Sequence, residues 1–151
     1  MVTVMQYKKL GLNLYSADVH YGKIDLKSTH RFSCFFIVQH TDDKKFIKDQ
    51  AIQLLLAGCR NFDFYGKMES LWHSEFDEAD ILLFPDSTAE TVALTSGWET
   101  LVEFVDALHA ELSLRSFVPH DYYLLYDDAA LYKEALRLLD PFNNSEKECS
   151  F

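Results

Sequence analysis

The sequence is poor in residues that interrupt regular structure and in residues that build disulfide frameworks. Only three prolines and five glycines occur among 151 residues, and no Pro- or Gly-rich linker is present. The three cysteines form an odd count without a Cys-x-x-Cys pair, which indicates neither a disulfide framework nor a zinc-ligand array. The length of one ordinary domain predicts a single domain over residues 1–142 and a frayed tail over 143–151.

Long apolar runs are also missing. The longest nearly apolar run, residues 32–38, is far shorter than the ~20 residues that a membrane-spanning helix needs. The first five residues lack the charged and apolar regions of a secretory signal. Together with the absence of a disulfide pattern, this predicts a cytoplasmic protein that does not associate with membranes.

Basic residues are scarce in the second half of the chain. Residues 1–67 hold ten Lys and Arg against six Asp and Glu, a net charge of +4, whereas residues 68–151 hold four against eighteen, a net charge of −14. Nucleic-acid binding is disfavoured, because phosphate contacts need clustered cations. An acidic half favours solubility or attraction to a basic partner.

Motifs for nucleotide, metal or hydrolytic chemistry are absent from the sequence. The loop after the first apolar strand, residues 40–43, has no glycine to bring the backbone close to a phosphate. No Gly-x-Ser-x-Gly or His-Glu-x-x-His motif occurs. His73 and Glu75 have the spacing of a zinc deaminase motif, but the downstream Pro-Cys-x-x-Cys of that site is missing. No cofactor is predicted.

What the sequence does contain is an alternation of strand-like and helix-like segments. Apolar runs predict strands at 31–39, 61–65, 81–84 and 121–126, and short edge strands at 2–5, 12–15 and 19–24. Helices are predicted from a cap at Thr41 or Asp42 to Gly58, over 67–79, from a capping box at Ser96–Glu99 to Leu112, and from Asp127 or Asp128 to Asp140. This order predicts an α/β fold, a three-layer sandwich with a mainly parallel sheet, helices on both faces and N-terminal short strands at an edge.

Acidic side chains recur at helical spacing on two of the predicted helices. Like charges four residues apart destabilise a helix by roughly 0.2–0.5 kcal/mol per pair, and no Lys or Arg compensates them on the third helix before Arg115. They indicate either a solvated acidic face or a surface for a basic partner. Metal binding at His73 is disfavoured, because acids along an exposed helix rarely converge. The residues are Glu69, Asp77 and Asp80 on the second helix and Glu99, Glu103 and Asp106 on the third.

Two tryptophans and two potentially reactive residues add to this picture. Trp72 and Trp98 adjoin the acidic segments, and aromatic residues of this kind serve as interface anchors as well as core residues. Cys59 and His73 flank the 61–65 strand, where a thiol beside an imidazole would serve as a nucleophile. The alternative for this pair is a buried cysteine near a helical histidine bonded to backbone.

A short pattern in the middle of the chain resembles a family of small, largely uncharacterised bacterial α/β proteins. The pattern consists of Gly58-Cys59-Arg60-Asn61-Phe62, then Tyr65-Gly66, then Trp72-His73 with Asp77. Asn61 stands where that family has an aromatic residue, and the pattern implies little about function.

The overall profile resembles immunity proteins of bacterial contact-dependent growth inhibition systems. Such proteins are small, acidic, cytosolic single domains, and the resemblance implies a tight complex with a basic toxin domain, often a nuclease. The expected function is therefore a non-enzymatic immunity protein, with a partner surface formed by Glu69, Trp72, Asp77, Asp80, Trp98, Glu99, Glu103 and Asp106. The alternatives are a small cysteine-dependent enzyme using Cys59 and His73, and a regulatory or structural binding subunit.

Overall fold

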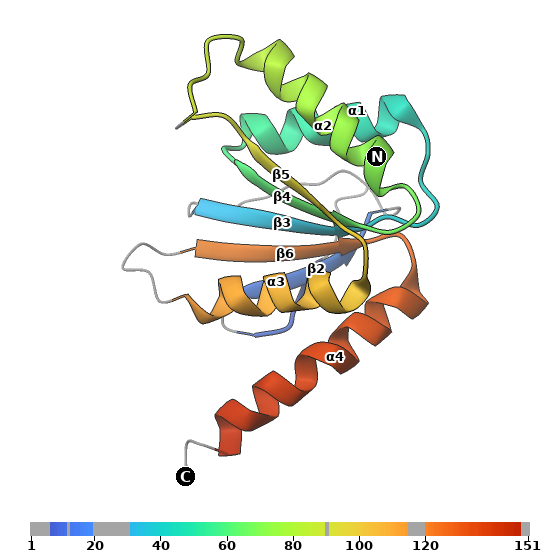
Figure 1. Ribbon diagram of the computed structural model, residues 1–151, viewed down its shortest axis with the longest axis vertical. Helices are drawn as coiled ribbons and strands as arrows, with labels where there is room; N and C mark the ends of the chain where they lie inside the picture. The colour runs from blue at the N-terminus through green and yellow to red at the C-terminus, as the bar shows by residue number, and fades with distance from the viewer. Residues whose placement is uncertain (1–6, 12, 20–30, 90, 115–119, 149–151) are drawn as a thin grey trace.

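The computed structural model describes residues 7–11, 13–19, 31–89, 91–114 and 120–148 as an α/β protein with a six-stranded sheet (Figure 1). The sheet order is β1-β2-β6-β3-β4-β5, in which β1 and β2 pair antiparallel and all other neighbours pair parallel. The elements are β1 (Lys8–Lys9), β2 (Leu14–Asp18), β3 (Arg31–Ile37), α1 (Lys44–Leu56), β4 (Asn61–Tyr65), α2 (Glu69–Leu83), β5 (Leu94–Trp98), α3 (Leu101–Ser113), β6 (His120–Tyr126) and α4 (Ala129–Glu148). The predicted fold class is confirmed.

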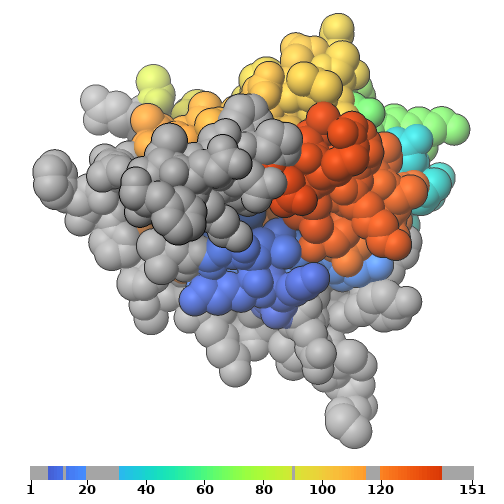
Figure 2. All heavy atoms as spheres, turned by 90° about the horizontal axis from the view of Figure 1, so that it is seen from below, coloured from blue at the N-terminus to red at the C-terminus, as the bar shows by residue number. Residues whose placement is uncertain are grey.

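Two helices cover each face of the sheet, so the fold has three layers. Figure 1 shows α1 and α2 on one side of the strands and α3 and α4 on the other. Seen from below, the surface of α3 (gold) lies beside that of α4 (red) (Figure 2). Strand β3 carries apolar side chains on both faces. Phe36 packs under α1 and α2, and Phe35 packs under α3 and α4.

The core beneath α2 is mainly aromatic. The ring of Phe36 lies 5.4 Å from that of Phe64 and 5.2 Å from that of Trp72, and Phe76 closes the group at 5.0 Å from Phe64. Such pairs add about 0.5–1.5 kcal/mol each to the stabilisation from burial. This cluster fixes α2 against β3 and β4, and thereby fixes the outward-facing residues of α2 beside the edge strand β5.

The chain reverses its progress across the sheet between β3 and β6. From β3 it moves outward through α1, β4 and α2 to β5, and it then returns through α3 on the opposite face to β6, next to β3. In open parallel sheets, the crevice at the carboxyl ends of strands on either side of such a switch point is the usual ligand site. Here that position lies between residues 38–43 and residues 127–128.

Two sequence predictions for the middle of the chain are wrong. Residues 81–83 continue helix α2 rather than forming a strand, and Ile81 and Leu82 are 68% and 62% exposed. The strand that follows α2 is instead β5, which begins in a stretch assigned to no element and includes residues 96–98 of the predicted capping box. An apolar run of four residues is too short to show whether its period is that of a helix or that of a strand. Strand β5 lies at the edge of the sheet and is mostly exposed, so its sequence does not have the apolar pattern of a buried strand.

The helix termini differ from prediction in several places. Helix α1 is capped by Asp43 rather than Thr41 or Asp42, and it ends before Gly58, whose positive φ of 101° confirms the predicted left-handed glycine. Helix α3 is capped by Thr100 rather than by the predicted Ser96 box. The last helix does not end at Asp140: α4 continues through residues 141–148, most of the predicted tail. The strand predicted at 2–5 and most of that at 19–24 lie outside the described residues.

Candidate partner-binding surface

The switch point of the sheet is closed by a carboxylate of the protein itself. Asp127 Oδ1 accepts a hydrogen bond from the backbone N–H of Gln39 at 2.7 Å, and Oδ2 accepts from the N–H groups of His40 and Thr41 at 2.9 and 2.8 Å. The Thr41 hydroxyl adds a fourth bond at 2.9 Å. Successive N–H groups of this kind form an anion-binding concavity. Because Asp127 fills it, this crevice does not offer free N–H groups to a phosphate.

The neighbouring Asp128 begins helix α4 and joins it to the same loop. Its Oδ1 accepts from the backbone N–H of Leu131 at 2.9 Å, as an N-cap does, and its Oδ2 lies 2.8 Å from Nε2 of His40. These bonds hold the pKa of Asp128 below its usual value, the Leu131 bond contributing most. The sequence prediction identified Asp127 and Asp128 only as alternative caps and missed the role of Asp127 in closing the crevice.

Along α2, two of the predicted acidic residues flank a histidine beside the edge strand. His73 Nε2 lies 2.7 Å from the hydroxyl of Thr95 on β5, which donates to Asp77 Oδ1 at 2.7 Å. Glu69 Oε1 lies 3.9 Å from His73 Nδ1. The side chains of Glu69 and Asp77 are 23% and 48% exposed, so both carboxylates face solvent while being held near β5.

The carboxylate of Glu69 lies directly against Gly97. A Cβ atom on Gly97 would fall 1.5 Å from Glu69 Oε1, so this position in β5 has room only for glycine while Glu69 keeps its conformation. Gly66 is constrained in a related way, because its φ is 128° and an added Cβ would lie 2.4 Å from the carbonyl oxygen of Val38. The two glycines allow the loops at this edge of the sheet to approach one another closely.

A pocket of about 520 Å³ lies at this carboxyl edge. Glu69 reaches it from α2, Trp98 reaches it from the end of β5, and Glu99 reaches it from the turn between β5 and α3. The other lining residues are Gln39, Tyr65, Gly66, Lys67 and Gly97. Three of the predicted partner-binding residues, carried by different elements, therefore meet in one concavity.

Trp98 is held in the pocket by an acidic residue of the neighbouring strand. Its indole N–H donates to Asp63 Oδ1 at 2.9 Å. The pKa of Asp63 is raised to about 6, chiefly by burial and also by Glu111, while the hydrogen bond from Trp98 acts in the opposite direction. Asp63 is not among the residues predicted for the partner surface, so its contact with Trp98 was not predicted.

The acids of α3 remain on the outer surface. Glu99, Glu103 and Asp106 are exposed, and α3 contains no Lys or Arg. Thr100 Oγ1 accepts from the N–H of Glu103 at 3.1 Å and donates to Glu103 Oε1 at 2.8 Å. The N3 acid of the cap is therefore Glu103, and Glu99 precedes the helix instead of serving in a capping box.

Two predicted surface residues lie in the interior. Trp72 is fully buried and its indole N–H donates to the carbonyl oxygen of Thr41 at 2.9 Å. Asp80 is 4% exposed and its Oδ2 accepts from the backbone N–H of Ala93 at 3.1 Å. Asp80 shares a helical sector with Glu69, but the chain returning toward β5 passes over that end of α2. Trp72 and Asp80 are therefore removed from the partner-binding set.

The polar partners of Cys59 and of His73 lie in different parts of the fold. The thiol of Cys59 is fully buried and donates to the carbonyl oxygens of Phe32 and Asn61, each at 3.4 Å. The polar partners of His73 are the residues of α2 and β5 described above. Burial also raises the pKa of Cys34, whose Sγ lies 3.9 Å from that of Cys59.

The residues that the structure describes bear on two structural features: metal-ligand groups and membrane-spanning helices. Among them, no group of three or more His, Cys, Asp or Glu side chains is arranged to hold a metal ion. No described helix is long and apolar enough to cross a membrane.

Comparison of the chain with protein-family models, with curated proteins and with solved structures finds no match.

Proposed function

We propose that the protein is a non-enzymatic binding protein that neutralises a basic toxin domain, as immunity proteins do. The observation that carries this proposal is the convergence of Glu69 and Glu99 on one pocket beside Trp98. Glu69 comes from α2, and Glu99 comes from the turn between β5 and α3. Their convergence distinguishes this edge from an acidic surface that serves only solubility, because such a surface has no need of a concavity with an aromatic wall.

The outer face of α3 extends the negative charge away from the pocket. Glu103 and Asp106 are exposed there, and the helix carries no compensating Lys or Arg. A one-signed surface attracts an oppositely charged partner over several ångströms and raises the association rate in a salt-dependent manner. A nuclease toxin fits this description, since its nucleic-acid-binding surface is rich in cations.

The pocket suits a single basic side chain of the partner. An arginine or lysine entering it meets the carboxylates of Glu69 and Glu99 and the indole of Trp98, which Asp63 holds in place. Paired carboxylates favour a guanidinium or ammonium group, and an indole ring adds a cation–π contribution of about 0.5–2 kcal/mol. A fixed aromatic residue in a pocket is also typical of an interface hot spot.

The absence of enzymatic activity is part of the proposal and is supported by two features. The crevice at which open α/β proteins commonly bind nucleotides is filled by Asp127. The thiol of Cys59 is buried and hydrogen-bonded to backbone carbonyl groups rather than to an imidazole.

The experiment is a titration of the protein with basic nuclease toxin domains at several salt concentrations, using calorimetry. We expect affinity to fall as salt rises. We expect reversal of Glu99 and Asp106 together (E99K/D106K) to weaken binding by at least about tenfold. These two acids are chosen because Glu103 is needed by the α3 cap.

The matched control is D49K, which reverses an exposed aspartate on α1, on the opposite face of the sheet from α3. It changes the net charge by the same amount per site and is expected to leave affinity within about twofold, because screening at physiological salt limits distant charges. Equal weakening by D49K and by a single E99K substitution would refute a localised surface. Absence of any salt-sensitive complex would refute the proposed class of partner.

A further inference from the structure

A second and larger cavity lies at the opposite edge of the sheet, where the parallel strands begin. It has a volume of about 800 Å³, within the range of small-molecule pockets. Arg31 and His120, the first residues of β3 and β6, are paired in the parallel register and line one end of it. Arg60 and Asn61 line the middle, where β4 begins. The cavity thus gathers cationic groups in a protein whose net charge is −10.

Arg60 is held in a fixed position at this cavity. Its Nη1 donates to the carbonyl oxygens of Leu55 and Cys59, both at 2.9 Å, at the end of helix α1. Its guanidinium lies 4.4 Å from the ring centroid of Phe84. No described residue accepts a hydrogen bond from its Nε or Nη2. One part of the guanidinium therefore fixes the side chain, and the remaining donors are available to a ligand without a further ordering cost.

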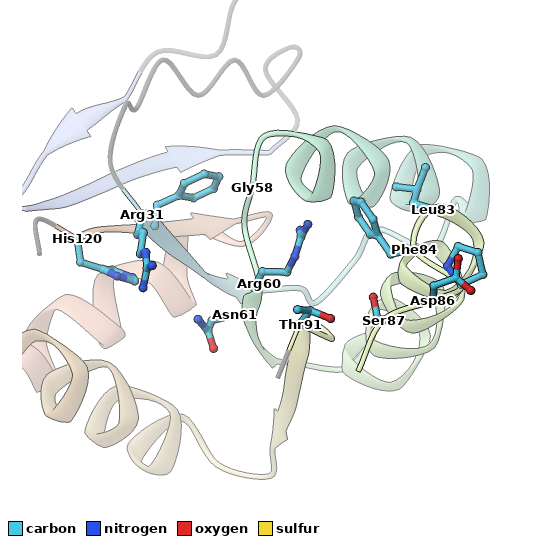
Figure 3. A pocket seen from close by; sticks show the side chains of 12 residues that line it. Arg31, Gly58, Arg60, Asn61, Leu83, Phe84, Asp86, Ser87, Thr91 and His120 are labelled. Atoms are coloured by element: carbon cyan, nitrogen blue, oxygen red, sulfur yellow. The ribbon is translucent and has the colours of Figure 1, made fainter. Parts of the chain in front are cut away.

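Arg31 adds a second cation that has no carboxylate partner among the described residues. It is exposed, and it lies beside His120 at the cavity (Figure 3). His120 Nε2 is 2.8 Å from the buried hydroxyl of Ser33, and burial lowers the pKa of this histidine, so its imidazole is neutral at pH 7. The one carboxylate in the lining, Asp86, lies at the other side of the cavity from Arg31 in Figure 3.

The remaining wall of the cavity is apolar with two hydroxyl groups. Phe32, Leu83 and Pro85 supply the apolar surface, and Ser87 and Thr91 supply the hydroxyls. A combination of a mainly apolar wall with a few fixed polar groups is typical of sites for small organic molecules. Guanidinium groups match the paired oxygens of carboxylates and phosphates in particular.

We propose that this cavity binds a small organic anion, whose carboxylate or phosphate contacts the remaining donors of the Arg60 guanidinium and whose apolar body lies against the Phe32 and Leu83 wall. Arg31 lies at the other end of the cavity, on the face of β3 that carries Ser33, and contributes its positive charge from there. The site is separate from the acidic pocket, because it occupies the amino ends of the strands rather than the carboxyl ends. It does not depend on the proposed toxin partner.

The test is calorimetric titration of the full chain with four probes: benzoate, phenyl phosphate, inorganic phosphate and benzyl alcohol. We expect benzoate or phenyl phosphate to bind with a Kd of about 1 mM or tighter and the neutral alcohol to bind at least about tenfold more weakly. The ratio of benzoate to phenyl phosphate affinity distinguishes a carboxylate ligand from a phosphate ligand. Equal affinity of inorganic phosphate and phenyl phosphate would overturn the apolar part of the site.

Three variants assign the binding to this cavity. R60Q and S87D are each expected to weaken binding of the preferred anion by about tenfold, whereas R137Q, at an exposed arginine on α4, leaves it unchanged. R60Q also loses its contacts with the end of α1, so S87D, which adds a carboxylate to the cavity wall and leaves those contacts in place, is the decisive variant. Unchanged affinity in S87D with an unchanged Tm overturns the proposal, as does the failure of both organic anions to bind.

Discussion

The carboxylate of Asp127 accepts hydrogen bonds from both the backbone N–H and the hydroxyl of Thr41, at 2.8 and 2.9 Å. The same carboxylate accepts from the two preceding N–H groups, so three consecutive donors of the β3–α1 loop converge on one residue of the β6–α4 loop. This arrangement joins the two strands at the switch point of the sheet. The carboxylate of Asp127 occupies the position that a bound anion would take, and it connects the β3–α1 loop to the β6–α4 loop.

Replacement of Asp127 by asparagine is expected to destabilise the protein strongly. The amide keeps the size of the side chain but removes its charge and turns an NH₂ group toward N–H donors, which leaves buried donors without an acceptor. Such losses cost about 1–3 kcal/mol for each unsatisfied group, so we expect a decrease of about 3 kcal/mol in the free energy of unfolding, measured with urea at pH 7. D128N, which loses one cap and one contact with His40, should cost about 1 kcal/mol. An equal loss of stability in both variants would contradict the role of Asp127 in connecting the two loops.

The contact between Gly97 and Glu69 predicts a coupling between the two positions. In the wild-type background, G97A displaces the Glu69 carboxylate, because the new Cβ would lie 1.5 Å from Oε1. In the E69A background that clash is absent, and G97A should stabilise the strand by about 0.4–1 kcal/mol through the loss of unfolded-state entropy. A double-mutant cycle measured by urea unfolding gives the coupling. Additive effects of the two substitutions would mean that the contact does not form.

The buried thiols predict slow labelling in the folded protein. In a C149S variant, only Cys34 and Cys59 remain, and both are fully buried. We expect reaction with a disulfide reagent at pH 7 to be at least about 100-fold slower than in denaturant, since it requires local or global opening. Rapid labelling of one thiol under native conditions would contradict the burial. It would also revive the possibility of a cysteine-dependent activity at Cys59.

The elements that could be predicted from the sequence are those whose burial produces a recognisable pattern of apolar residues. Strand β3 was predictable because helices cover both of its faces and its residues from Cys34 onward are all apolar. Strand β5 was missed because it lies at an edge: Leu94 is 62% exposed, and the strand continues as Thr-Ser-Gly. The apolar run at 81–84 was mistaken for a strand because the end of α2 carries exposed Ile81 and Leu82.

The candidate surface was only partly predictable. Helical spacing shows which side of a helix a residue lies on, but it does not show which other segment of the chain packs against that side. Glu69 and Asp80 share a sector of α2, yet Glu69 reaches a pocket and Asp80 is buried by the chain that leads to β5. Trp72 and Trp98 have similar acidic surroundings in the sequence, yet only Trp98 lines the pocket. The exposed charge of α3 was predictable because local spacing and composition suffice for it.

A carboxyl group beside that pocket gives the protein a defined pH dependence. The pKa of Asp63 is raised from its usual 3.8 to about 6, chiefly by burial. The folded state therefore binds the proton of Asp63 more tightly than the unfolded chain does. Between about pH 4 and pH 6 the folded state carries more protons at this site, so this group lowers the free energy of unfolding as the pH rises. Above that range its unfavourable contribution is constant.

Replacement of Asp63 by asparagine should remove this dependence. The amide is neutral at every pH, and its Oδ1 can still accept the hydrogen bond from Trp98. We expect the free energy of unfolding of D63N, measured relative to wild type in urea, to rise by about 2–3 kcal/mol from pH 4 to pH 7, since each pKa unit corresponds to about 1.4 kcal/mol. D49N, at an exposed aspartate, serves as the control variant. His120 titrates in both proteins, so its contribution cancels in the comparison. A D63N difference that stays flat or falls with pH would show that Asp63 is ionised at little cost in the folded protein.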